Sequence, residues 1–199
     1  KYALCDVDVN LKKDTTITLN KDNLVIDLSI SKTEKLVATT NSQKSLIWNS
    51  SNIDVATVSD DGTITGLKNG TTTITATTYD GVKASCDVTV QTSVSEITLN
   101  ALSQTLDLSG TKTFQIIPTI IPSTANVNTT LYIKSNNTNI ATVSEQGIVT
   151  GVSNGKTEII VYNGSGKTAS LNVTVQTSPT GIYFSENKDD SSKYLTVGK

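Results

Sequence analysis

The sequence predicts an all-β protein built from two tandem copies of one small antiparallel β-sandwich. Three observations lead to this fold class. Residues 48–76 (WNSSNIDVATVSDDGTITGLKNGTTTITA) return with the same spacing at residues 133–161, 85 positions later. Gly62, Gly66 and Gly70 have counterparts at the same offset. Between the glycines, apolar and polar residues alternate, as in strands with one buried face. A long repeat with its glycines in register indicates a tandem array of one module.

The glycines stand where short strands must turn. Residues 60–62 (Asp-Asp-Gly) lie between alternating residues, which predicts a hairpin because glycine adopts positive φ without steric cost. The second copy has Glu-Gln-Gly at residues 145–147. Asn-Gly pairs at residues 69–70 and 154–155 precede the next strand and predict a second hairpin-like turn in each copy. Closely spaced turns of this kind indicate short antiparallel strands.

The composition fits lean β-cores and argues against several classes of function. Of the 199 residues, 36% are hydrophobic and 5% are aromatic, so each core must consist largely of Val, Ile and Leu. The net charge of −2 is too small to attract nucleic acid or an anionic membrane. The chain has no histidine, the commonest catalytic base and metal ligand. No apolar run approaches the ~20 residues that span a bilayer, and no signal peptide opens the sequence. We therefore expect no nucleic-acid partner and no membrane insertion of this segment.

The chain opens with residues that resemble a closing strand. Ala3, Cys5, Val7 and Val9 repeat the spacing of the apolar residues within 84–90, and period-two spacing places them on one face of a strand. We expect residues 1–10 to be the last strand of a preceding module. Module one is then predicted over residues 16–91. Its early strands are predicted at residues 17–19, 24–28, 35–39 and 46–48.

Module two is predicted over residues 96–176. It carries about five extra residues around 118–130, which we interpret as a surface loop. The joints at residues 91–95 and 176–180 are short enough to allow bending but not tumbling, which predicts an elongated, semi-rigid array. The early strands of module two are predicted at residues 97–99, 106–108 and 114–117.

The end of the chain resembles the beginning of a module. Residues 181–199 contain two apolar runs, 182–184 and 194–197, that match the opening strands of the preceding modules. Residues 1–10 and 181–199 would therefore be complementary pieces of one fold, with unpaired main-chain groups. Because such strands pair readily with other chains, we expect both ends to be ordered by a neighbouring chain or an adjacent module.

A specific motif runs through both modules. Residues 48–90 carry W-x-S-S-N-x-x-V-A-T-V-x-x-x-G-x-x-T-G, a Gly-Thr turn into T-I-T-A and a closing C-x-V-T-V. This motif resembles the bacterial Ig-like group 2 (BIG2) domain. The resemblance implies an immunoglobulin-like sandwich, common as tandem stalks in bacterial surface proteins, adhesins, cell-wall-attached enzymes and phage tail proteins, and it brings no catalytic residues. Module two departs from the motif by apolar exchanges: Ile133 for Trp48, Ile140 for Val55 and Leu171 for Cys86.

The two cysteines and the tryptophan could have a function, but a structural role explains them better. Cys5 and Cys86 would occupy equivalent positions in successive modules, tens of ångströms apart, whereas a disulfide needs Cα atoms within about 7 Å. Because module two has Leu171 there, we interpret Cys86 as an inert buried thiol. Trp48 is the only tryptophan and could stack on a sugar ring. Its counterpart Ile133 favours a role in core packing.

The repeat also predicts the buried residues. Positions that alternate with polar residues in both copies should face the core of each sandwich. In module one these are Trp48, Val58, Ile64, Ile74, Cys86 and Val88. In module two these are Ile133, Val143, Ile159, Leu171 and Val173.

The acidic and amide-rich segments do not form a recognisable site. Asp60 and Asp61, or Asp6 and Asp8, could contribute to Ca²⁺ binding, which needs about six to eight oxygens, but neither pair resembles a calcium loop and residues 145–146 replace the first. Turn solvation explains them better. No lysine occupies an apolar strand position in both modules, which argues against isopeptide crosslinks. Formal glycosylation motifs, expected by chance, begin at Asn49, Asn69, Asn128, Asn136, Asn163 and Asn172.

These observations predict a protein without catalytic, cofactor or metal-binding residues, and therefore not an enzyme. The leading hypothesis is a stalk or spacer of a bacterial cell-surface or secreted protein, extracellular, with neighbouring Ig-like modules as its partners. One alternative is an adhesion module that binds a host-surface protein or a glycan through loops or edge strands, with residues 118–130 as the first region to examine. A second alternative is a decoration module of a phage tail or virion.

Overall fold

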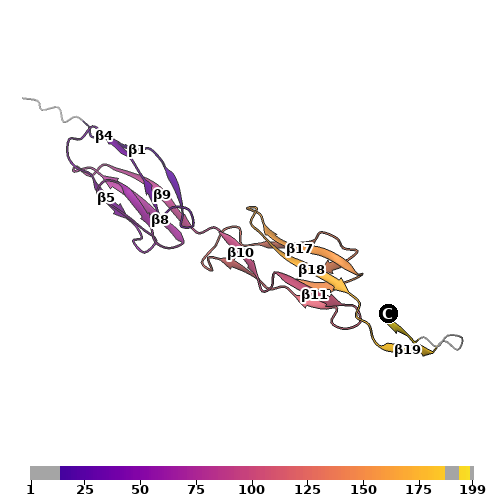
Figure 1. The fold of residues 1–199 in the computed structure, drawn as a ribbon. Helices are drawn as coiled ribbons and strands as arrows, with labels where there is room; N and C mark the ends of the chain where they lie inside the picture. Colours follow the sequence, from indigo (N-terminus) through magenta and orange to yellow (C-terminus); the bar gives the residue numbers. More distant parts are fainter. Residues whose placement is uncertain (1–13, 187–192, 198–199) are drawn as a thin grey trace, which may run out of the picture. The chain divides into compact units, whose positions relative to one another are not determined.

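The computed structural model describes residues 14–186 and 193–197, and every regular element in these residues is a β-strand (Figure 1). The chain divides into two compact units, Lys1–Gln91 and Thr92–Lys199. Each unit contains one β-sandwich, and we keep the names module one and module two for these sandwiches. The structure thus confirms the predicted all-β fold class with two modules.

Module one packs a four-stranded sheet against a three-stranded sheet. Its strands are β1 (Ile17–Leu19), β2 (Asn23–Asp27), β3 (Thr33–Lys35), β4 (Ala38–Thr40), β5 (Ile47–Ser50), β6 (Ala56–Val58), β7 (Thr63–Gly66), β8 (Gly70–Thr77) and β9 (Lys83–Gln91). The larger sheet has the order β2-β9-β8-β5 and the smaller one β3-β7-β6. Strands β1 and β4 form a separate two-stranded ribbon.

Module two repeats this topology. Its strands are β10 (Glu96–Leu99), β11 (Ser103–Asp107), β12 (Thr113–Gln115), β13 (Pro118–Ile121), β14 (Leu131–Ser135), β15 (Ala141–Val143), β16 (Ile148–Gly151), β17 (Gly155–Asn163) and β18 (Thr168–Gln176). The sheets have the orders β11-β18-β17-β14 and β12-β16-β15, and β10 pairs with β13.

One strand pair in each module is parallel. Strand β2 pairs with β9, and β11 pairs with β18, in parallel register, whereas the other ladders of the two modules are antiparallel. The parallel pair joins an early strand of the module to its last strand. Turn residues in the sequence predict only hairpins between consecutive strands, so they do not predict the pairing of β2 with β9 or of β11 with β18.

The two predicted turns differ in structure. The turn at residues 60–62 joins β6 to β7 as an antiparallel hairpin, with Val58 opposite Ile64, as predicted. Gly62 has a φ of 82°, a conformation that glycine adopts at little cost. The second turn is not a hairpin, because β7 belongs to the three-stranded sheet and β8 to the four-stranded sheet. Residues 67–69 therefore cross between the sheets.

Each module has an apolar core between its sheets. The predicted core residues Ile64, Ile74, Cys86 and Val88 are buried in module one. Leu24, Ile26 and Leu36, which precede the repeated segment, complete much of this core. In module two the predicted residues Ile159, Leu171 and Val173 are likewise buried.

Four predicted core residues are only partly buried. Trp48 and Val58 pack against the core of module one, and Ile133 and Val143 pack against that of module two, without being enclosed. All four lie on β5, β6, β14 and β15, which are outermost strands of their sheets, although outermost strands also carry buried residues such as Ile26 on β2. Alternation identifies the face of a strand that points inward, but it does not identify edge strands.

Two strands follow module two. Strands β19 (Ile182–Glu186) and β20 (Lys193–Val197) pair antiparallel, with Ile182 opposite Val197, and coincide with the two apolar runs of the tail. Their assignment to a further module stays a prediction. The predicted closing strand at residues 1–10, with Cys5, Asp6 and Asp8, lies outside the described residues.

Candidate functional sites at the ends and on the flank of module two

The segment that enters module two is packed into that module. Thr92 and Val94 are only 3% and 2% exposed, and Val94 belongs to the apolar core of module two. The Ser95 N–H donates a hydrogen bond to the carbonyl of Ile121, at 2.8 Å. Residues 92–95 of the predicted joint are therefore an integral part of module two.

A loop of module two holds this entry segment. The N–H of Asn126 donates to the carbonyl of Thr92, and the N–H of Thr92 donates to Oδ1 of Asn126, both at 2.8 Å. Ser93 and Val127 add a parallel bridge. These contacts come from the connection between β13 and β14, and we call Asn126 and Val127 with their contacts to residues 92–93 the clamp on the entry segment.

The predicted surface loop at residues 118–130 is shorter in the structure. Pro118–Ile121 is strand β13, and only residues 122–130 connect it to β14. This connection begins at a cis Ile121-Pro122 bond and includes Asn128, whose φ is 58°. The side-chain amide of the buried Asn163 donates to the Asn128 carbonyl at 3.0 Å. The loop is therefore held by module two itself.

Module one holds its own entry segment with an equivalent asparagine. Asn41 lies 85 positions before Asn126, accepts a hydrogen bond from the Thr16 N–H at 2.9 Å and donates to the Asp14 carbonyl at 3.0 Å. This role of Asn41 and Asn126 was not predicted from the sequence. The available signal was an asparagine at the same repeat position in both copies, just after the β1–β4 and β10–β13 ribbons.

The segment that leaves module two is also anchored. Asp107, at the end of β11, accepts hydrogen bonds from the Ser178 N–H at 3.1 Å and from the Ser109 hydroxyl at 2.6 Å. The Ser109 hydroxyl also lies 3.1 Å from the Ser178 carbonyl, and the Thr177 hydroxyl donates to Asn154 at 2.9 Å. The Ser109 hydroxyl and then Ser178 hold the pKa of the Asp107 carboxyl well below its usual value.

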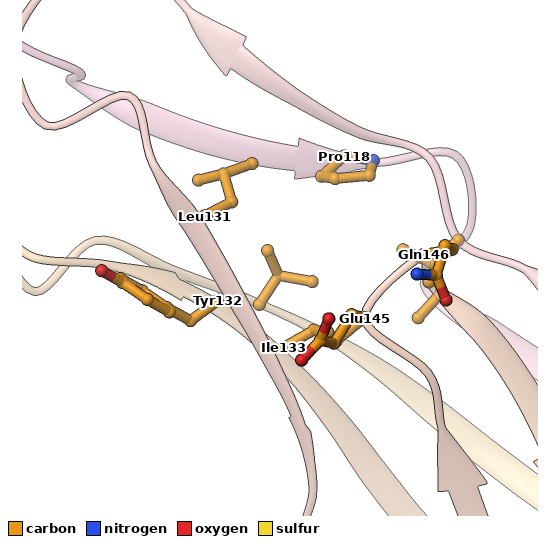
Figure 2. Close-up of a pocket in the computed structure, with 9 residues that line it drawn as sticks. Pro118, Leu131, Tyr132, Ile133, Glu145 and Gln146 are labelled. Atoms are coloured by element: carbon orange, nitrogen blue, oxygen red, sulfur yellow. The ribbon is translucent and has the colours of Figure 1, made fainter.

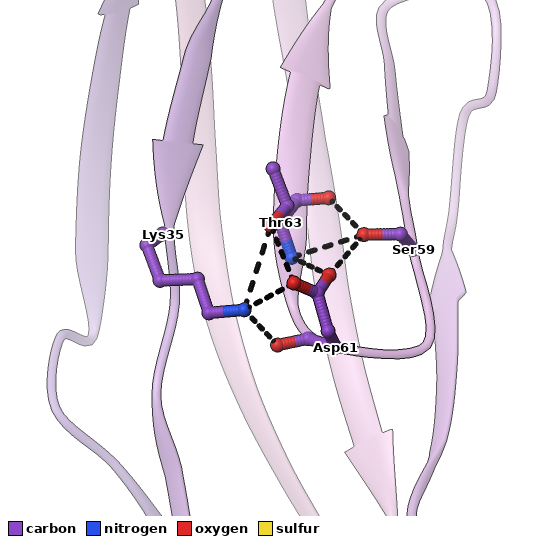
Figure 3. A network of polar contacts seen from close by, with 4 residues as sticks. All are labelled: Lys35, Ser59, Asp61 and Thr63. Carbon is purple, nitrogen blue, oxygen red and sulfur yellow. Dashed lines mark hydrogen bonds and ion pairs between the residues drawn. The ribbon is translucent and has the colours of Figure 1, made fainter.

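The β6–β7 hairpin of module one is braced by an exposed ionic network (Figure 3). Lys35 lies 2.6 Å from an Asp61 carboxylate oxygen and also donates to the Asp61 carbonyl. The Ser59 hydroxyl and the Thr63 N–H donate to the other carboxylate oxygen, at 2.5 and 3.1 Å. Lys35, followed by Ser59 and Thr63, holds the pKa of Asp61 well below its usual value. Asp61 therefore braces the turn through an ion pair and hydrogen bonds.

Module two braces the same turn without charge. Gln115 stands where module one has Lys35, and its side-chain amide donates to the Gln146 carbonyl at 2.8 Å. Gln146 stands where module one has Asp61. The two modules thus bind the same main-chain carbonyl of the turn with an ammonium group in one case and an amide in the other.

A small apolar hollow opens on the flank of module two (Figure 2). Its volume is about 110 Å³. Figure 2 places Leu131 and Ile133, from β14, beside the hollow with Pro118 across from them and Glu145 and Gln146 at one end. Its lining is completed by Ile116, Tyr132, Gly147 and Val161.

The hollow lies where module one has its tryptophan. Module one also has a more open depression at this place, lined in part by Leu36, Leu46 and Trp48, but that depression does not reach Ala76 or Gly62, the counterparts of Val161 and Gly147. Trp48 and Ala76 are opposite each other across β5 and β8, and Ile133 and Val161 are the corresponding pair in module two. The indole of Trp48 packs on Gly62, since a Cβ added to that glycine would lie 2.9 Å from the ring. Replacing Ala76 by Val161 restores only part of the lost volume. The apolar exchange of Trp48 for Ile133 fits the predicted fold, but the pattern does not reveal the hollow.

The remaining predicted sites behave as structural elements. Cys86 is fully buried, and burial raises the pKa of its thiol, as does the neighbouring Asp87. No hydrogen bond or ion pair of Asp60 is found within residues 14–186. In the described part of the chain, no group of three or more acidic, Cys or His residues could hold a metal ion. None of the described residues forms a helix long and apolar enough to cross a bilayer.

Known proteins share this sequence pattern and fold. The family model of the bacterial Ig-like domain (group 2) matches residues 13–90 and 93–181. An alpha-L-arabinofuranosidase of Bifidobacterium longum is 57% identical over 49 residues, which are 24% of this chain and 5% of that protein. Ice-binding protein 1 of Shewanella frigidimarina is 32% identical over 137 residues, which are 65% of this chain and 15% of that protein. The chain thus spans a small part of the length of these relatives.

A solved structure gives a more distant likeness. The surface layer protein SbsC is 20% identical over 86% of this chain and 29% of its own, with a TM-score of 0.38.

Proposed function

The chain belongs to the bacterial Ig-like domain (group 2) family, and from this premise we propose that it is a non-catalytic spacer of a bacterial protein. In this role the two modules position other domains of a longer extracellular protein, at the cell surface or in secreted form. Their partners in this role are the neighbouring Ig-like modules.

The observation that carries this proposal is that hydrogen bonds hold the chain segments at both ends of module two in place. A spacer transmits position only if the chain between its modules is fixed. At the entry, Asn126 binds the buried main chain of Thr92. At the exit, Asp107 and Asn154 bind Ser178 and Thr177. Both segments are thereby tied to the body of module two.

The relatives support the same role. One is named an arabinofuranosidase and the other an ice-binding protein, so related modules accompany two unrelated activities. A module that occurs in proteins with such different activities is better explained as a structural spacer than as a catalytic or ligand-binding domain. The exposed ionic network at Asp61 and the buried thiol of Cys86 also have structural explanations within module one.

The proposal is tested by backbone ¹⁵N relaxation on the full chain. We expect the amides of residues 92–95 to have order parameters of about 0.85, as in the strands of module two. Values below about 0.6 at these amides would indicate a flexible tether and overturn the spacer proposal. Asn154→Ala, which affects only the exit, serves as the control and should leave the entry amides unchanged.

An adhesion role is the second candidate, and the hollow beside β14 favours it. An apolar opening next to an edge strand is a feature that spacing does not require. The hollow is consistent with the binding of a protein ligand rather than with catalysis. This candidate function does not depend on the hydrogen bonds at the two ends of module two.

A further inference from the structure

We infer that the hollow of module two is a binding site for one aromatic side chain, carried by an extended segment of a partner protein that pairs with β14. This site goes beyond the spacer role, because a spacer needs no ligand on its flank. The inference rests on the comparison between the two modules and on the position of the hollow in the sheet.

The shape of the ligand follows from module one. There the same space beside the β6–β7 turn is occupied by the indole of Trp48, which reaches Gly62. Module two keeps the glycine, as Gly147, but has Ile133 in place of the tryptophan. Module two therefore keeps the glycine turn but lacks the ring. Because the Gln115 amide would lie 3.1 Å from a Cβ at Gly147, a partner ring would occupy only the part of this space that Gln115 leaves open. An aromatic side chain from a partner can take the place that Trp48 takes in module one.

The chemistry of the lining favours an apolar ring over a sugar. Five aliphatic side chains line the hollow, whereas Glu145 and Gln146 are its only side chains with a carboxylate or amide group. A sugar would bury hydroxyl groups that need hydrogen-bond partners, and an unpaired buried hydroxyl is unfavourable. An indole or phenyl ring has no such requirement. Apolar cavities of about 150 Å³ bind benzene, so a hollow of about 110 Å³ that is open to solvent suits one ring with an exposed edge. The aliphatic lining residues are Ile116, Pro118, Leu131, Ile133 and Val161.

The ligand is delivered by an extended segment because the hollow adjoins a sheet edge. Strand β14 is the last strand of its sheet and pairs only with β17 there. The N–H of Asn136 donates a hydrogen bond to the Glu158 carbonyl. In an antiparallel pair every second residue exchanges hydrogen bonds with the neighbouring strand, so Lys134, two residues before Asn136, also bonds to β17 and Ile133 does not. The main-chain groups of Ile133 therefore face away from β17. They are available to an added strand, as in β-augmentation.

The hollow and the free edge of β14 can bind the same extended segment. In a sheet, residues directly opposite each other project their side chains from the same face. A partner residue opposite Ile133 would therefore project toward the hollow, as Ile133 does. The neighbouring partner residues would project to the other face, where Tyr132 is 51% exposed and its ring stacks on that of Tyr162 at 5.5 Å. One extended segment can thus place an aromatic ring in the hollow while its backbone pairs with β14.

The experiment titrates the full, ¹⁵N-labelled chain with a short capped peptide, Thr-Val-Trp-Val-Thr, and follows amide shifts. We expect changes at Ile133, Gly147 and Val161, and binding at least about tenfold weaker for the same peptide with Ala in place of Trp. A Trp peptide with N-methylated main-chain amides should also bind at least about tenfold weaker, because it cannot add a strand.

Two variants locate the site. Ile133→Trp fills the hollow from within and should abolish the binding, with the amide spectrum of module one as the control for folding. The double variant Trp48→Ile and Ala76→Val deepens the depression beside residue 48 in module one and should create a second site, reported by Gly62. This second variant tests the inference even if Ile133→Trp fails to fold.

Several results would overturn the inference. These are equal affinity of the Trp and Ala peptides, unchanged affinity for folded Ile133→Trp, and no shift at Gly147 at millimolar peptide. Shifts at Gly147 caused by arabinose or glucose, without any by the peptide, would replace the protein ligand with a glycan. None of these results bears on the order of residues 92–95, so the spacer proposal stands or falls separately.

Discussion

Asn126 satisfies both main-chain groups of Thr92, accepting from its N–H and donating to its carbonyl, each at 2.8 Å. Thr92 is buried, so water cannot replace these bonds without opening the structure. One residue of the loop thus binds the entry segment through both its side chain and its main chain. Asn41 plays a related part in module one, although it binds Thr16, directly before β1, rather than a residue farther upstream.

Asn126→Ala should loosen the entry of module two. The variant leaves the buried Thr92 N–H without this acceptor, and an unsatisfied buried group costs about 1–3 kcal/mol of stability. We expect amide exchange to accelerate at residues 92–95 and 126–128, together with a lower free energy of unfolding of module two in urea.

Asn100→Ala is the matched control for this change. Asn100 accepts from the Ile117 N–H at 2.8 Å, within the body of module two. Both variants should lower the stability of module two, but only Asn126→Ala should expose Thr92 to exchange. Equal protection of Thr92 in the two variants would contradict the clamp.

Gly62→Ala should destabilise module one far more than Gly81→Ala. Both glycines have positive φ, 82° and 92°, where alanine costs about 1–2 kcal/mol. A Cβ at Gly62 would also meet the Leu36 carbonyl and the Trp48 ring, whereas a Cβ at Gly81 meets nothing within 4 Å. The overpacking should add about 1–3 kcal/mol. The fluorescence of the single tryptophan reports urea unfolding of module one in both variants, and equal midpoints would show that the contact is relieved by small movements.

The sequence predicts many of the strands because local chemistry determines them. The single strand predicted at residues 35–39 is wrong, since β3 ends at Lys35 and β4 begins at Ala38 in a different sheet. Alternating residues on either side of residues 60–62 specify the β6–β7 hairpin, and the structure has it in that register. The parallel pairing of β2 with β9 escapes prediction, since these strands are far apart in the chain and no turn links them. The Asn-Gly pair at residues 69–70 predicts a hairpin-like turn, but residues 67–69 connect β7 and β8 in different sheets. A turn with glycine does not reveal which sheet the next strand joins.

The candidate sites were less predictable than the fold. The clamp depends on a side chain of a loop, Asn126, whose partner is distant in sequence and hydrogen-bonds through its main chain. The hollow depends on a difference in volume between Ile133 and Trp48 that is only partly offset at Val161. Apolar identity is enough to predict the fold at these positions, but the empty space depends on how three neighbouring side chains fit together.

Trp48→Ala should cost module one about 2–3 kcal/mol, at or below the low end for large aromatic residues in a core. The ring is only partly buried on the edge strand β5, so part of its surface contacts water already. Circular dichroism in urea measures the loss, because the variant has no tryptophan to report it. The conservative variant Trp48→Phe should recover more than half of the lost stability. An unchanged midpoint for Trp48→Ala would mean that the indole contributes nothing to the packing around Gly62.

Asp61→Asn should remove part of the acid sensitivity of module one. Hydrogen bonds and Lys35 lower the pKa of Asp61 in the folded state below its usual value of 3.8. A lowered folded pKa contributes stability that is fully present above the unfolded value and is lost as the pH falls through the folded pKa. Wild-type module one should therefore lose stability below about pH 4, and Asp61→Asn should be less stable at neutral pH and lose less on acidification. Tryptophan fluorescence in urea at neutral and acidic pH measures both. Asp60→Asn removes the same charge without touching Lys35, Ser59 or Thr63, and an equal effect of the two variants would show that net charge, rather than the hairpin network, sets the pH dependence.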